Sequence, residues 1–470
     1  MSALPTPPSP DGPWGPRLQA RFAGQALPLL HVAGETWTAA SLWTGRRQWS
    51  ATFRALGVTA GDRIAVALPP CAAFVQVLLT ALRDQLTLAV LPPTPPSGIT
   101  AALEAVDARV AVAETAAPHV LVPGEAGLPA VPLPAARRAR LPASPDARLL
   151  LRTSGTTGLG RWVALGDTNL LSVLDSHAPV LAGPAPCVAS MLPWHHVFGL
   201  VLDLLAGLLA GAELVRDPDG GRDPVALLAR MADVPVTHCH AVPLTVARLA
   251  AVPGGRAWLE GLAGGIVGGA AVTGPLVDVL ARTRLRAGYG QTEASPGVLL
   301  GDPGHWAEGM LGRPAGCAVR LDAEGELLFR GPNACLGLWT PTGLARLDPD
   351  RWVASGDLVA PRPDGTYRFL GRRAADFKLA NGRMVAAARV EAALRERATG
   401  LREVALVSPD GETLELWYDA DGAPPDMATL AHALGGLASR PPRLRPLPGA
   451  EWPRTPKGET DRAALRARRA

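Results

Sequence analysis

Apolar and polar positions repeat with two different periods along the first part of the chain. Residues 39–56 and 72–82 have the spacing of helices, whereas residues 63–68 form a short apolar run typical of a buried strand. A further helical segment at residues 99–106 precedes another short apolar run at residues 110–113. Because helices alternate with buried strands, the pattern predicts an α/β fold with a parallel sheet covered by helices.

An uncharged run at residues 64–82 has the length of a membrane span. Pro69 and Pro70 interrupt it, so a strand followed by a helix is the better interpretation, and we expect no membrane span. The Pro-rich residues up to about Pro28 lack the basic start and apolar block of a secretory signal. We expect this segment to be loosely held.

Length and composition limit the classes of protein that fit. A chain of 470 residues is too long for one ordinary core and implies two or more domains. Its 48% hydrophobic and 19% charged residues are typical of a globular protein, and a net charge of +4 gives little support for nucleic-acid binding. Five cysteines form no CxxC pair, which favours a reducing cytoplasm.

A run of glycines and hydroxyl side chains follows the strand-like residues 147–151 and predicts a phosphate-binding loop. Two glycines allow a tight turn that brings amide N–H groups close to a ligand, and four hydroxyls supply further donors. Arg161 adds a positive charge nearby. The run is not a Walker loop, and a plain surface turn is the alternative. Its residues are Thr153, Ser154, Gly155, Thr156, Thr157 and Gly158.

The string TSGTTG followed by a basic residue resembles the signature of the adenylate-forming superfamily. This superfamily comprises acyl-CoA synthetases, adenylation domains of peptide synthetases and luciferases. Gly160 and Arg161 stand where that family usually has Pro-Lys, and arginine still offers cationic donors to phosphate. The resemblance implies that residues 153–158 and Arg161 bind ATP, and it removes the surface-turn alternative.

A second string, YGQTE, begins at Tyr289 and resembles the family's YGxTE motif. The resemblance implies that Tyr289 stacks on adenine, that the Thr292 hydroxyl contacts the α-phosphate, and that Glu293 binds magnesium. Gly290 and Gln291 are then also part of the ATP site. An aromatic face, a neutral donor and a hard oxygen ligand suit these three tasks.

Three further strings occur in the family's order. The string GGIVGGAA resembles the strand that ends in G-G-A-P, which implies that adenine lies against Gly269, Ala270 and Ala271. The string SGDL resembles the [ST]-G-D segment, whose aspartate binds both ribose hydroxyls, and the pair GR resembles the G-R whose arginine contacts the nucleotide. These two roles fall on Asp357 and Arg372.

The pocket for the acid is implied by PWHHVFG, which resembles the family's P-x-x-H-V-[FY]-G and leads into an apolar helix at residues 200–210. By position, His196 gates or lines the carboxylate pocket. A histidine that is hydrogen-bonded at a helix entrance is the alternative. The other residues expected in this pocket are His238, Val242, Gly268, Gly290, Ser295 and Gly297.

The strand-like residues 236–243 carry His238 and His240 on one face, with Cys239 between them. Two histidines and a cysteine allow a zinc site, but no remote second pair has the spacing of metal ligands. A wall of the acyl pocket is the favoured interpretation of this segment.

The chain after the G-R pair resembles the superfamily's hinge and its small C-terminal domain, which rotates between the two half-reactions. We therefore expect a nucleotide-binding domain at residues 1–371 and a small domain at residues 372–470. Ala374 takes the hinge position that normally holds Asp or Lys.

Lys378 lies in the string DFKLANG, where relatives keep a lysine on the loop that rotation presents to the active site. This string closely resembles a segment of feruloyl-CoA synthetase-like members and, less closely, one of long-chain acyl-CoA ligases. A helix is predicted at residues 387–397, with Val390 and Leu394 on its inner face.

The string PRTPKGETDR resembles the family's P-x-T-x-x-G-K-x-x-R, whose lysine bridges the substrate carboxylate and the α-phosphate. In register, Glu459 falls on that lysine, and Lys457 lies two residues earlier. A carboxylate there would repel both the acid and the triphosphate, and loss of one such stabiliser costs about 3 to 4 kcal/mol.

Two explanations of this departure compete. In the first, Lys457 does the work of the usual lysine, because a step of two residues in extended chain keeps the same face and moves the side chain by about 7 Å. In the second, the domain is impaired or dedicated to a partial reaction. We favour the first, since only Lys378 and Lys457 are lysines among 46 basic residues.

Together these strings predict a large α/β domain with a distorted β-barrel portion and a small mobile α+β lid. The predicted activity uses ATP and Mg²⁺ to convert a small aryl or acyl carboxylic acid to an adenylate, then transfers it to a thiol. Coenzyme A is favoured over the phosphopantetheine of an acyl or peptidyl carrier protein. A nucleotide-binding homologue with poor turnover is the alternative, and a serine hydrolase is disfavoured because no GxSxG elbow is present.

Overall fold

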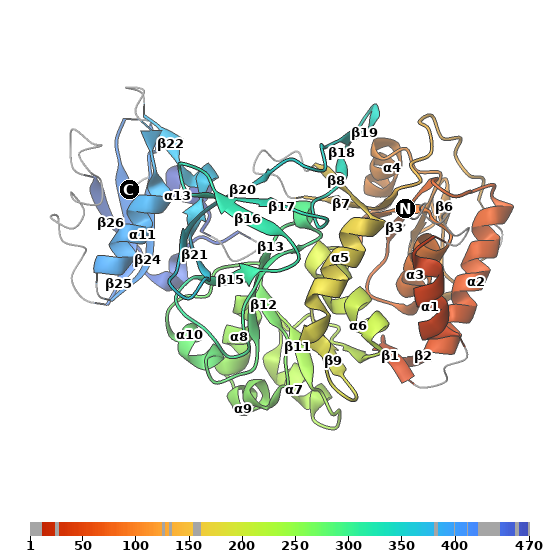
Figure 1. Ribbon diagram of the computed structural model, residues 1–470, viewed down its shortest axis with the longest axis horizontal. Coiled ribbons are helices and arrows are strands. Elements are labelled where there is room, and N and C mark those ends of the chain that lie inside the picture. Colours follow the sequence, from red (N-terminus) through yellow and green to blue (C-terminus); the bar gives the residue numbers. More distant parts are fainter. Residues whose placement is uncertain are drawn as a thin grey trace, which may run out of the picture.

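Five β-sheets and their covering helices make up the described part of the chain in a computed structural model (Figure 1). None of the described helices is long and apolar enough to cross a membrane. The residues that the structure describes are 12–23, 28–124, 127–130, 134–153, 161–379, 384–398, 400–410, 412–421, 442–455 and 460–468.

An eight-stranded sheet with helices on both faces lies at one end of the molecule (Figure 1). In spatial order its strands are β19 (Gly343–Arg346), β18 (Gly337–Thr340), β8 (Trp162–Gly166), β7 (Ala147–Arg152), β4 (Thr87–Val90), β3 (Arg63–Ala67), β5 (Val110–Ala113) and β6 (Val120–Leu121). Its helices are α2 (Ala39–Ala55), α3 (Ala72–Arg83) and α4 (Pro96–Ala105). Ile64 and Val66 pack with α2 and α3, whereas Ala65 and Ala67 pack with α4. The strands from β6 to β7 pair in parallel, which confirms the predicted sheet.

The expectation of loosely held chain up to Pro28 is wrong for α1 (Trp14–Phe22). Trp14, Leu18 and Phe22 follow one another at intervals of four residues, so they share one face of the helix. All three are fully buried in the same core as α2 and α3. This amphipathic pattern was missed because the residues on either side of it are rich in proline, which suggested an irregular segment.

A second sheet is largely parallel and carries part of the expected acid pocket. Its strands in spatial order are β11 (His238–His240), β9 (Cys187–Ser190), β10 (Glu213–Arg216), β1 (Pro28–Val32) and β2 (Glu35–Thr38). The apolar helix predicted at residues 200–210 is present, but its first part is a π-helix, η3 (Phe198–Leu205), continued by α6 (Ala206–Ala210). The other helices nearby are α5 (Asp167–His177), η2 (Ala178–Leu181), α7 (Pro224–Met231), α8 (Pro243–Ala250) and α9 (Gly255–Gly261).

A third, mostly antiparallel sheet corresponds to the expected barrel portion. Its strands in spatial order are β12 (Ile266–Gly268), β13 (Arg286–Gly290), β14 (Gly297–Leu300), β15 (Met310–Pro314), β21 (Tyr367–Arg372), β20 (Val353–Pro361), β17 (Glu326–Arg330) and β16 (Ala318–Leu321). The end strands β12 and β16 are not paired with each other, so the barrel is open in the described chain. Two short helices, α10 (Pro275–Leu280) and η4 (Thr292–Ala294), flank β13.

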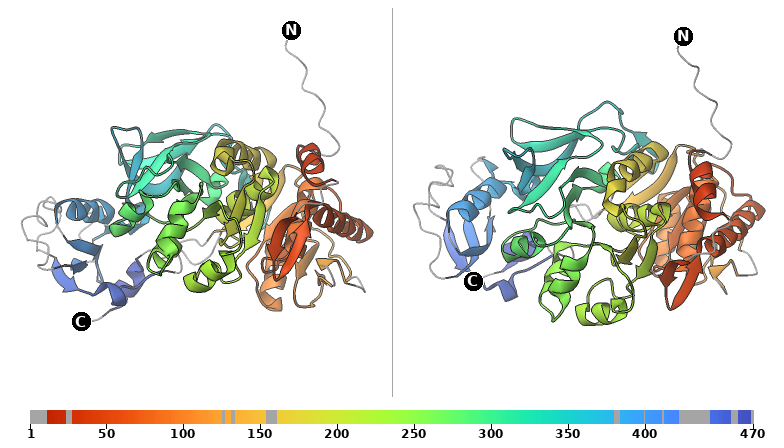
Figure 2. Two further views of the ribbon diagram at one scale, coloured as in Figure 1. Left: turned by 90° about the horizontal axis from the view of Figure 1, so that it is seen from below. Right: turned by 60° about the horizontal axis from the view of Figure 1, so that its bottom comes forward.

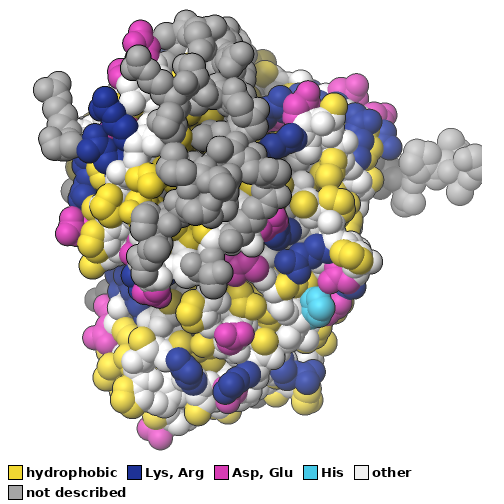
Figure 3. All heavy atoms as spheres, turned by 90° about the vertical axis from the view of Figure 1, so that its left-hand side faces the viewer, with side chains coloured by type: hydrophobic (Ala, Val, Ile, Leu, Met, Phe, Trp, Pro, Cys, Tyr) yellow, Lys and Arg dark blue, Asp and Glu magenta, His cyan; other side chains and the backbone are white. Residues whose placement is uncertain are grey.

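The C-terminal elements form a small unit beside the third sheet, at the end of the molecule opposite the first sheet (Figures 1 and 2). Its elements are η5 (Arg373–Ala375), β22 (Phe377–Lys378), β23 (Met384–Val385), α11 (Ala387–Arg397), β24 (Leu401–Val407), β25 (Glu415–Ala420), β26 (Arg443–Pro446), η6 (Gly449–Glu451) and α13 (Arg462–Ala467). Helix α11 has the predicted bounds, and Val390 and Leu394 are buried as predicted. On this end of the molecule, basic and acidic side chains are interspersed (Figure 3). The expected domain boundary after residue 371 falls within β21 and stays a prediction.

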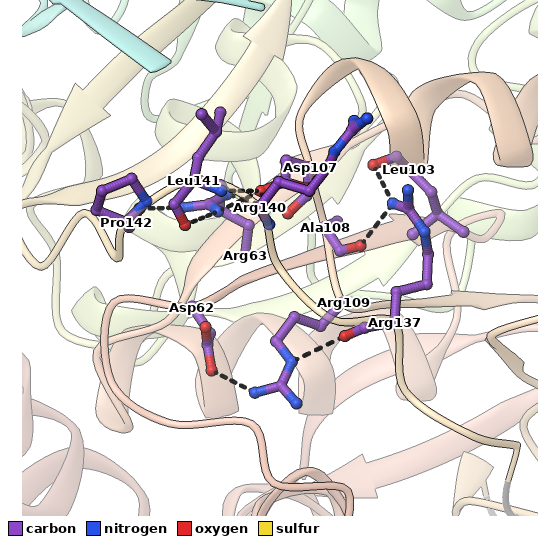
Figure 4. Close-up of polar contacts among 10 residues, drawn as sticks. All are labelled: Asp62, Arg63, Leu103, Asp107, Ala108, Arg109, Arg137, Arg140, Leu141 and Pro142. Atoms are coloured by element: carbon purple, nitrogen blue, oxygen red, sulfur yellow. Dashed lines mark hydrogen bonds and ion pairs between the residues drawn. The ribbon is translucent and has the colours of Figure 1, made fainter. Parts of the chain in front are cut away.

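A buried polar network attaches the segment before β7 to the first sheet (Figure 4). Arg63 donates to Asp107 Oδ2 at 2.9 Å and to the carbonyl oxygens of Leu141 and Pro142 at 3.0 and 2.7 Å. The same Asp107 oxygen accepts hydrogen bonds from the N–H groups of Arg140 and Leu141. Because β7 leads directly into the predicted phosphate loop, this Arg63–Asp107 network holds the chain that enters the loop.

Candidate functional site

A buried aspartate connects the tyrosine of YGQTE with the arginine of the G-R pair. Tyr289 Oη donates a hydrogen bond of 2.5 Å to Asp357 Oδ2, and Arg372 Nε lies 3.0 Å from Asp357 Oδ1. The Asp357 side chain is 2% exposed and that of Arg372 is 49% exposed. Burial and the adjacent Asp357 carboxylate raise the pKa of Tyr289 well above its ordinary value, so the phenol stays a donor. Three residues assigned separately to the ATP site therefore form one cluster.

The strand register explains why Asp357 meets Arg372. These two residues are Cα partners in the antiparallel β20–β21 pair, so their side chains project from the same face. Gly356 has a φ of +78°, and its N–H donates to Glu326 Oε1 at 2.8 Å. Ser355 Oγ accepts from the Asp357 N–H at 3.1 Å. The SGD string thus fixes the backbone on which the carboxylate is carried.

Close backbone contacts account for two glycines of the site. A Cβ on Gly290 would lie 1.5 Å from the carbonyl oxygen of Pro296. A Cβ on Gly268 would lie 2.5 Å from the carbonyl oxygen of Gly288, its partner on β13. Since real Cβ atoms do not approach an oxygen so closely, only glycine allows β13 to pack between β12 and β14 at these points.

The three residues expected against adenine follow β12 without regular secondary structure. Gly269 is exposed, whereas Ala270 and Ala271 are half-buried, so their main chain is accessible to a flat ring. A Cβ on Gly269 would lie 3.6 Å from Val242 Cγ1. The expected adenine wall therefore adjoins the expected acid pocket.

Thr292 and Glu293 begin the short helix η4 at the end of β13. The backbone oxygen of Glu293 accepts a hydrogen bond of 2.8 Å from the Cys335 N–H. Its half-buried carboxylate forms no hydrogen bond or ion pair with another described residue. The neighbouring Gln291 N–H donates to the Pro296 carbonyl at 3.0 Å. Backbone contacts thus fix η4 while the Glu293 carboxylate stays available to a ligand.

The base of the predicted phosphate loop is described, and its centre is not. Thr153 N–H donates to the Arg161 carbonyl oxygen at 2.9 Å, which brings the two ends of the loop together. The predicted ATP-binding residues Ser154, Gly155, Thr156, Thr157 and Gly158 lie outside the described residues.

His196 lies exposed at the entrance to η3, where its N–H donates to the Pro193 carbonyl at 3.1 Å. The ring of His195 packs against it, with 4.5 Å between ring centroids. Burial, His196 and Arg216 lower the pKa of His195 to about 4. His195 is therefore neutral at physiological pH, and His196 is the histidine that a ligand can reach.

The remaining expected pocket residues lie along β11 and the start of β14. His238 is buried, its Nδ1 lies 2.7 Å from Thr237 Oγ1, and burial lowers its pKa. Ser295 is fully buried, and its Oγ has no hydrogen-bond partner among the described residues. A Cβ on Gly297 would lie 2.3 Å from Cε1 of His177, so the His177 ring packs directly on this glycine.

Sequence reasoning did not single out His177 and Asp203, and it included His240 only as part of the strand interpreted as a wall of the acyl pocket. All three side chains are buried. Burial lowers the pKa of His177 to about 4, despite its hydrogen bond to the Val173 carbonyl. The alternation along β11 already placed His240 on the face of His238. His177 and Asp203 come from α5 and η3, and their proximity depends on tertiary packing that no local pattern encodes.

The catalytic residues expected from the C-terminal part are only partly described. Lys378 belongs to β22, but its side chain lies outside the described residues, as do Lys457 and Glu459. Arg462, at the end of the same string, donates to both carboxylate oxygens of Glu391 on α11, at 2.7 and 2.6 Å. The end of the string is therefore anchored to the small unit.

Comparisons with known proteins show which family and which fold the chain shares. A family model described as AMP-binding enzyme matches residues 19–339. Feruloyl-CoA synthase of Amycolatopsis sp is 28% identical over 417 residues, which cover 81% of this chain and 82% of that protein. Long-chain-fatty-acid–CoA ligase 6 of Rattus norvegicus is 32% identical over 186 residues, 33% of this chain and 27% of that one. The ATP-bound crystal structure of MatB from Rhodopseudomonas palustris superposes with a TM-score of 0.74 at 21% identity, covering 96% of this chain and 97% of that chain.

Proposed function

The chain belongs to the AMP-binding enzyme family of AMP-forming acid–thiol ligases, and on that premise we propose which reaction its residues perform. The enzyme activates a carboxylic acid with ATP as an acyl-adenylate and then transfers the acyl group to the thiol of coenzyme A. The observation that carries this proposal is the Tyr289–Asp357–Arg372 cluster, in which both carboxylate oxygens are already oriented. An oriented carboxylate beside an aromatic ring suits the ribose and adenine of ATP.

The first half-reaction forms one bond and breaks another at the α-phosphorus. An oxygen of the acid bonds to the α-phosphorus, and pyrophosphate leaves with the bridging oxygen. We assign the Thr292 hydroxyl, the loop of residues 153–158 and Arg161 to the phosphates, because such in-line transfer depends mainly on positioning and charge neutralisation. His196, exposed at the entrance to η3, lines the path of the carboxylate.

The Glu293 carboxylate fits a magnesium ion. It is a hard oxygen donor without a described protein partner, and Mg²⁺ prefers one or two carboxylates together with phosphate oxygens. The described residues contain no cluster of three or more His, Cys, Asp or Glu that could hold a metal by themselves. A single carboxylate completed by the nucleotide is therefore the arrangement that suits magnesium here, and the ion supplies neutralisation of the leaving pyrophosphate.

The second half-reaction transfers the acyl group to a thiol. The thiol sulfur bonds to the acyl carbon, AMP leaves, and the thiol proton passes to solvent. We assign this step to rotation of residues 372–470 about Ala374, with Lys457 acting in the first half-reaction and Lys378 presented in the second. Coenzyme A is the proposed acceptor, in keeping with the acceptor named for feruloyl-CoA synthase.

Two other candidates rest on particular features. A carrier-protein phosphopantetheine has the same reactive thiol as coenzyme A and is the alternative acceptor. An impaired adenylate-binding homologue is the alternative to an active ligase, because Glu459 stands where relatives have the catalytic lysine.

The test is acid-dependent exchange of labelled pyrophosphate into ATP, followed by thioester formation with coenzyme A or a phosphopantetheinylated carrier. Exchange together with a coenzyme A thioester is the expected result. Exchange with transfer only to the carrier would replace the proposed acceptor. ATP binding without exchange for any acid would overturn the ligase assignment and leave the impaired homologue.

A further inference from the structure

Strand β20 contains a bulge immediately before the Asp357 carboxylate. Glu326 pairs with Leu358 and Leu328 pairs with Ala354, so two steps along β17 match four steps along β20. A bulge of this kind withdraws backbone groups from the ladder and changes the direction of a neighbouring side chain. The conformation of the bulge therefore decides where Asp357 points.

The Glu326 carboxylate takes the place of a backbone acceptor at this bulge. Its Oε1 accepts a hydrogen bond of 2.8 Å from the Gly356 N–H, and Gly356 has a left-handed φ of +78°. The Glu326 side chain is only 7% exposed, so water has little access to replace it. Because an unpaired buried N–H is unfavourable, Glu326 fixes the peptide that leads directly into Asp357.

The second oxygen of Glu326 binds the first element of the small C-terminal unit. Arg373 Nη1 on η5 donates to Glu326 Oε2 and also lies 3.1 Å from Asp322 Oδ2. Asp322 begins the turn of residues 322–325, which joins β16 to β17. Its Oδ1 accepts the N–H groups of Glu324 and Glu326 at 3.0 and 2.7 Å, so the turn is itself ordered. One buried carboxylate therefore connects η5 with the peptide before Asp357.

Further contacts join the same turn to the small C-terminal unit and to β20. Arg389 Nη2 on α11 donates to the Glu324 carbonyl oxygen. The Val359 N–H on β20 donates to the Gly325 carbonyl oxygen at 3.0 Å. The turn of residues 322–325 thus contacts α11 and η5 of the small C-terminal unit as well as the strand that carries Asp357.

We propose that Glu326 is a positioning residue for nucleotide binding, and that through Arg373 it couples docking of the small C-terminal unit to the orientation of Asp357. The inference rests on the proposed function, in which Asp357 binds the nucleotide. By thermodynamic linkage the coupling acts in both directions. A nucleotide on Asp357 should strengthen the attachment of η5, and loss of the Arg373 contact should weaken nucleotide binding.

Two simpler roles make different predictions. If Glu326 only completed the bulge, removal of the Arg373 side chain would leave the affinity for ATP unchanged. If Arg373 only formed a surface ion pair, which typically contributes little, its removal would change neither this affinity nor the attachment of η5. The shared carboxylate favours coupling, because its two oxygens are rigidly joined and a shift of Oε2 with Arg373 also moves Oε1.

The test is a double-mutant cycle on the full chain, with the Kd for ATP measured by calorimetry. Glu326→Ala is expected to raise the Kd by about tenfold or more, because it leaves the Gly356 N–H unpaired and frees the bulge. Arg373→Ala is expected to raise the Kd by about threefold or more in the wild-type background and to have no effect in Glu326→Ala. Arg373→Lys keeps the charge and should restore most of the affinity lost in Arg373→Ala.

A second measurement separates coupling from a purely structural role. ATP should slow amide hydrogen–deuterium exchange in the peptide that contains η5 in the wild type, and not in Glu326→Ala. Glu324→Gln is the matched control, since it removes an exposed carboxylate of the same turn that forms no hydrogen bond or ion pair with another described residue. It should keep the wild-type Kd and the wild-type protection of η5. If Glu326→Ala fails to fold, Glu326→Gln replaces it in the cycle.

Three results would overturn the inference: a wild-type Kd in the Glu326 variants, additive effects of the two substitutions, or ATP-dependent protection of η5 that persists without Glu326. The proposed function fails separately. Coupling without pyrophosphate exchange for any acid would support this inference and contradict the proposed activity, whereas exchange without coupling would do the reverse. A wild type that binds no ATP would overturn both.

Discussion

Asp357 faces Arg372 across the β20–β21 ladder, with 3.0 Å between Oδ1 and Nε. The other oxygen of the same carboxylate is held by Tyr289 at 2.5 Å. The positions of both oxygens are therefore set by the protein before a nucleotide binds. A site with this preorganisation pays less conformational entropy on binding than one whose carboxylate is free to rotate.

Removing the charge of Asp357 should weaken nucleotide binding. Hydrogen bonds to charged groups contribute about 1.5–3 kcal/mol, so Asp357→Asn is expected to raise the Kd for ATP by about tenfold to a hundredfold. Tyr289→Phe keeps the ring and should raise it less. The measurement is calorimetric titration with ATP, and Asp364→Asn, an exposed carboxylate before β21, is the control. An unchanged Kd in Asp357→Asn would mean that this carboxylate does not contact the nucleotide.

Adding a methyl group at Gly290 should destabilise the fold around the site. Its Cβ would lie 1.5 Å from the Pro296 carbonyl oxygen, so β13 and β14 must separate. Overpacking of this kind typically costs about 1–3 kcal/mol, and Gly290→Ala should lower the Tm and the exchange rate together. Gly261→Ala meets no atom within 4 Å and serves as the matched control. Equal Tm values for the two variants would contradict the close contact.

The Arg63–Asp107 network should make stability depend on pH in the acidic range. Burial favours the neutral acid, but hydrogen bonds from the Leu141 and Arg140 N–H groups and from Arg63 outweigh it and lower the pKa of Asp107 in the folded state. The stabilisation is therefore present above the ordinary Asp pKa of about 3.9 and is lost as the pH falls through the folded-state value.

Asp107→Ala tests this directly. Because it leaves Arg63 buried without its partner, it is expected to lower the free energy of unfolding by about 3–5 kcal/mol at neutral pH, measured by urea denaturation. It should also flatten the acid limb of the stability profile. Asp175→Ala removes the exposed partner of Arg17 and should change stability by about 1 kcal/mol or less. A similar loss in both variants would show that burial of the network is unimportant.

Glu293→Gln should weaken the dependence on magnesium without unfolding the protein. The substitution removes one anionic oxygen ligand, so the Mg²⁺ concentration for half-maximal exchange is expected to rise by about tenfold or more. Thermal stability should stay close to wild type, since η4 is held by backbone hydrogen bonds. Glu260→Gln, on an exposed position of α9, is the control. An unchanged magnesium requirement would remove Glu293 from the metal site.

Hydrophobic periods in the sequence predicted the helices and strands that depend mainly on interactions within their own segment. The bounds of β5 agree with the apolar run at residues 110–113, and those of α11 agree with the helix predicted at residues 387–397. Each segment shows the hydrophobic period of its own element in the sequence. Helix α4 begins at Pro96, earlier than the apolar spacing suggested, since proline is well suited to a first turn. The π-helical start of η3 was not predicted, because its apolar sequence fits an α-helix equally well.

The residues of the site likewise divide into those that sequence motifs identified and those that only tertiary packing brings together. The family resemblance identified Tyr289, Asp357 and Arg372 one string at a time, and the β20–β21 register explains why two of them meet. No local pattern pairs His177 with Gly297, because one ends a helix and the other begins a strand far along the chain. Their contact depends on how α5 packs on the third sheet, which only the tertiary structure reveals.

The central claim, acid activation by a lysine displaced from its usual position, is tested most directly by ATP–pyrophosphate exchange on three proteins. These are the wild type, Lys457→Ala and Glu459→Lys, each assayed with a panel of aryl and aliphatic acids. We predict exchange in the wild type and a fall of about two decades or more in Lys457→Ala, the loss expected when one electrostatic stabiliser is removed. A silent wild type whose exchange is restored by Glu459→Lys would contradict this account and identify the native chain as an impaired adenylate binder.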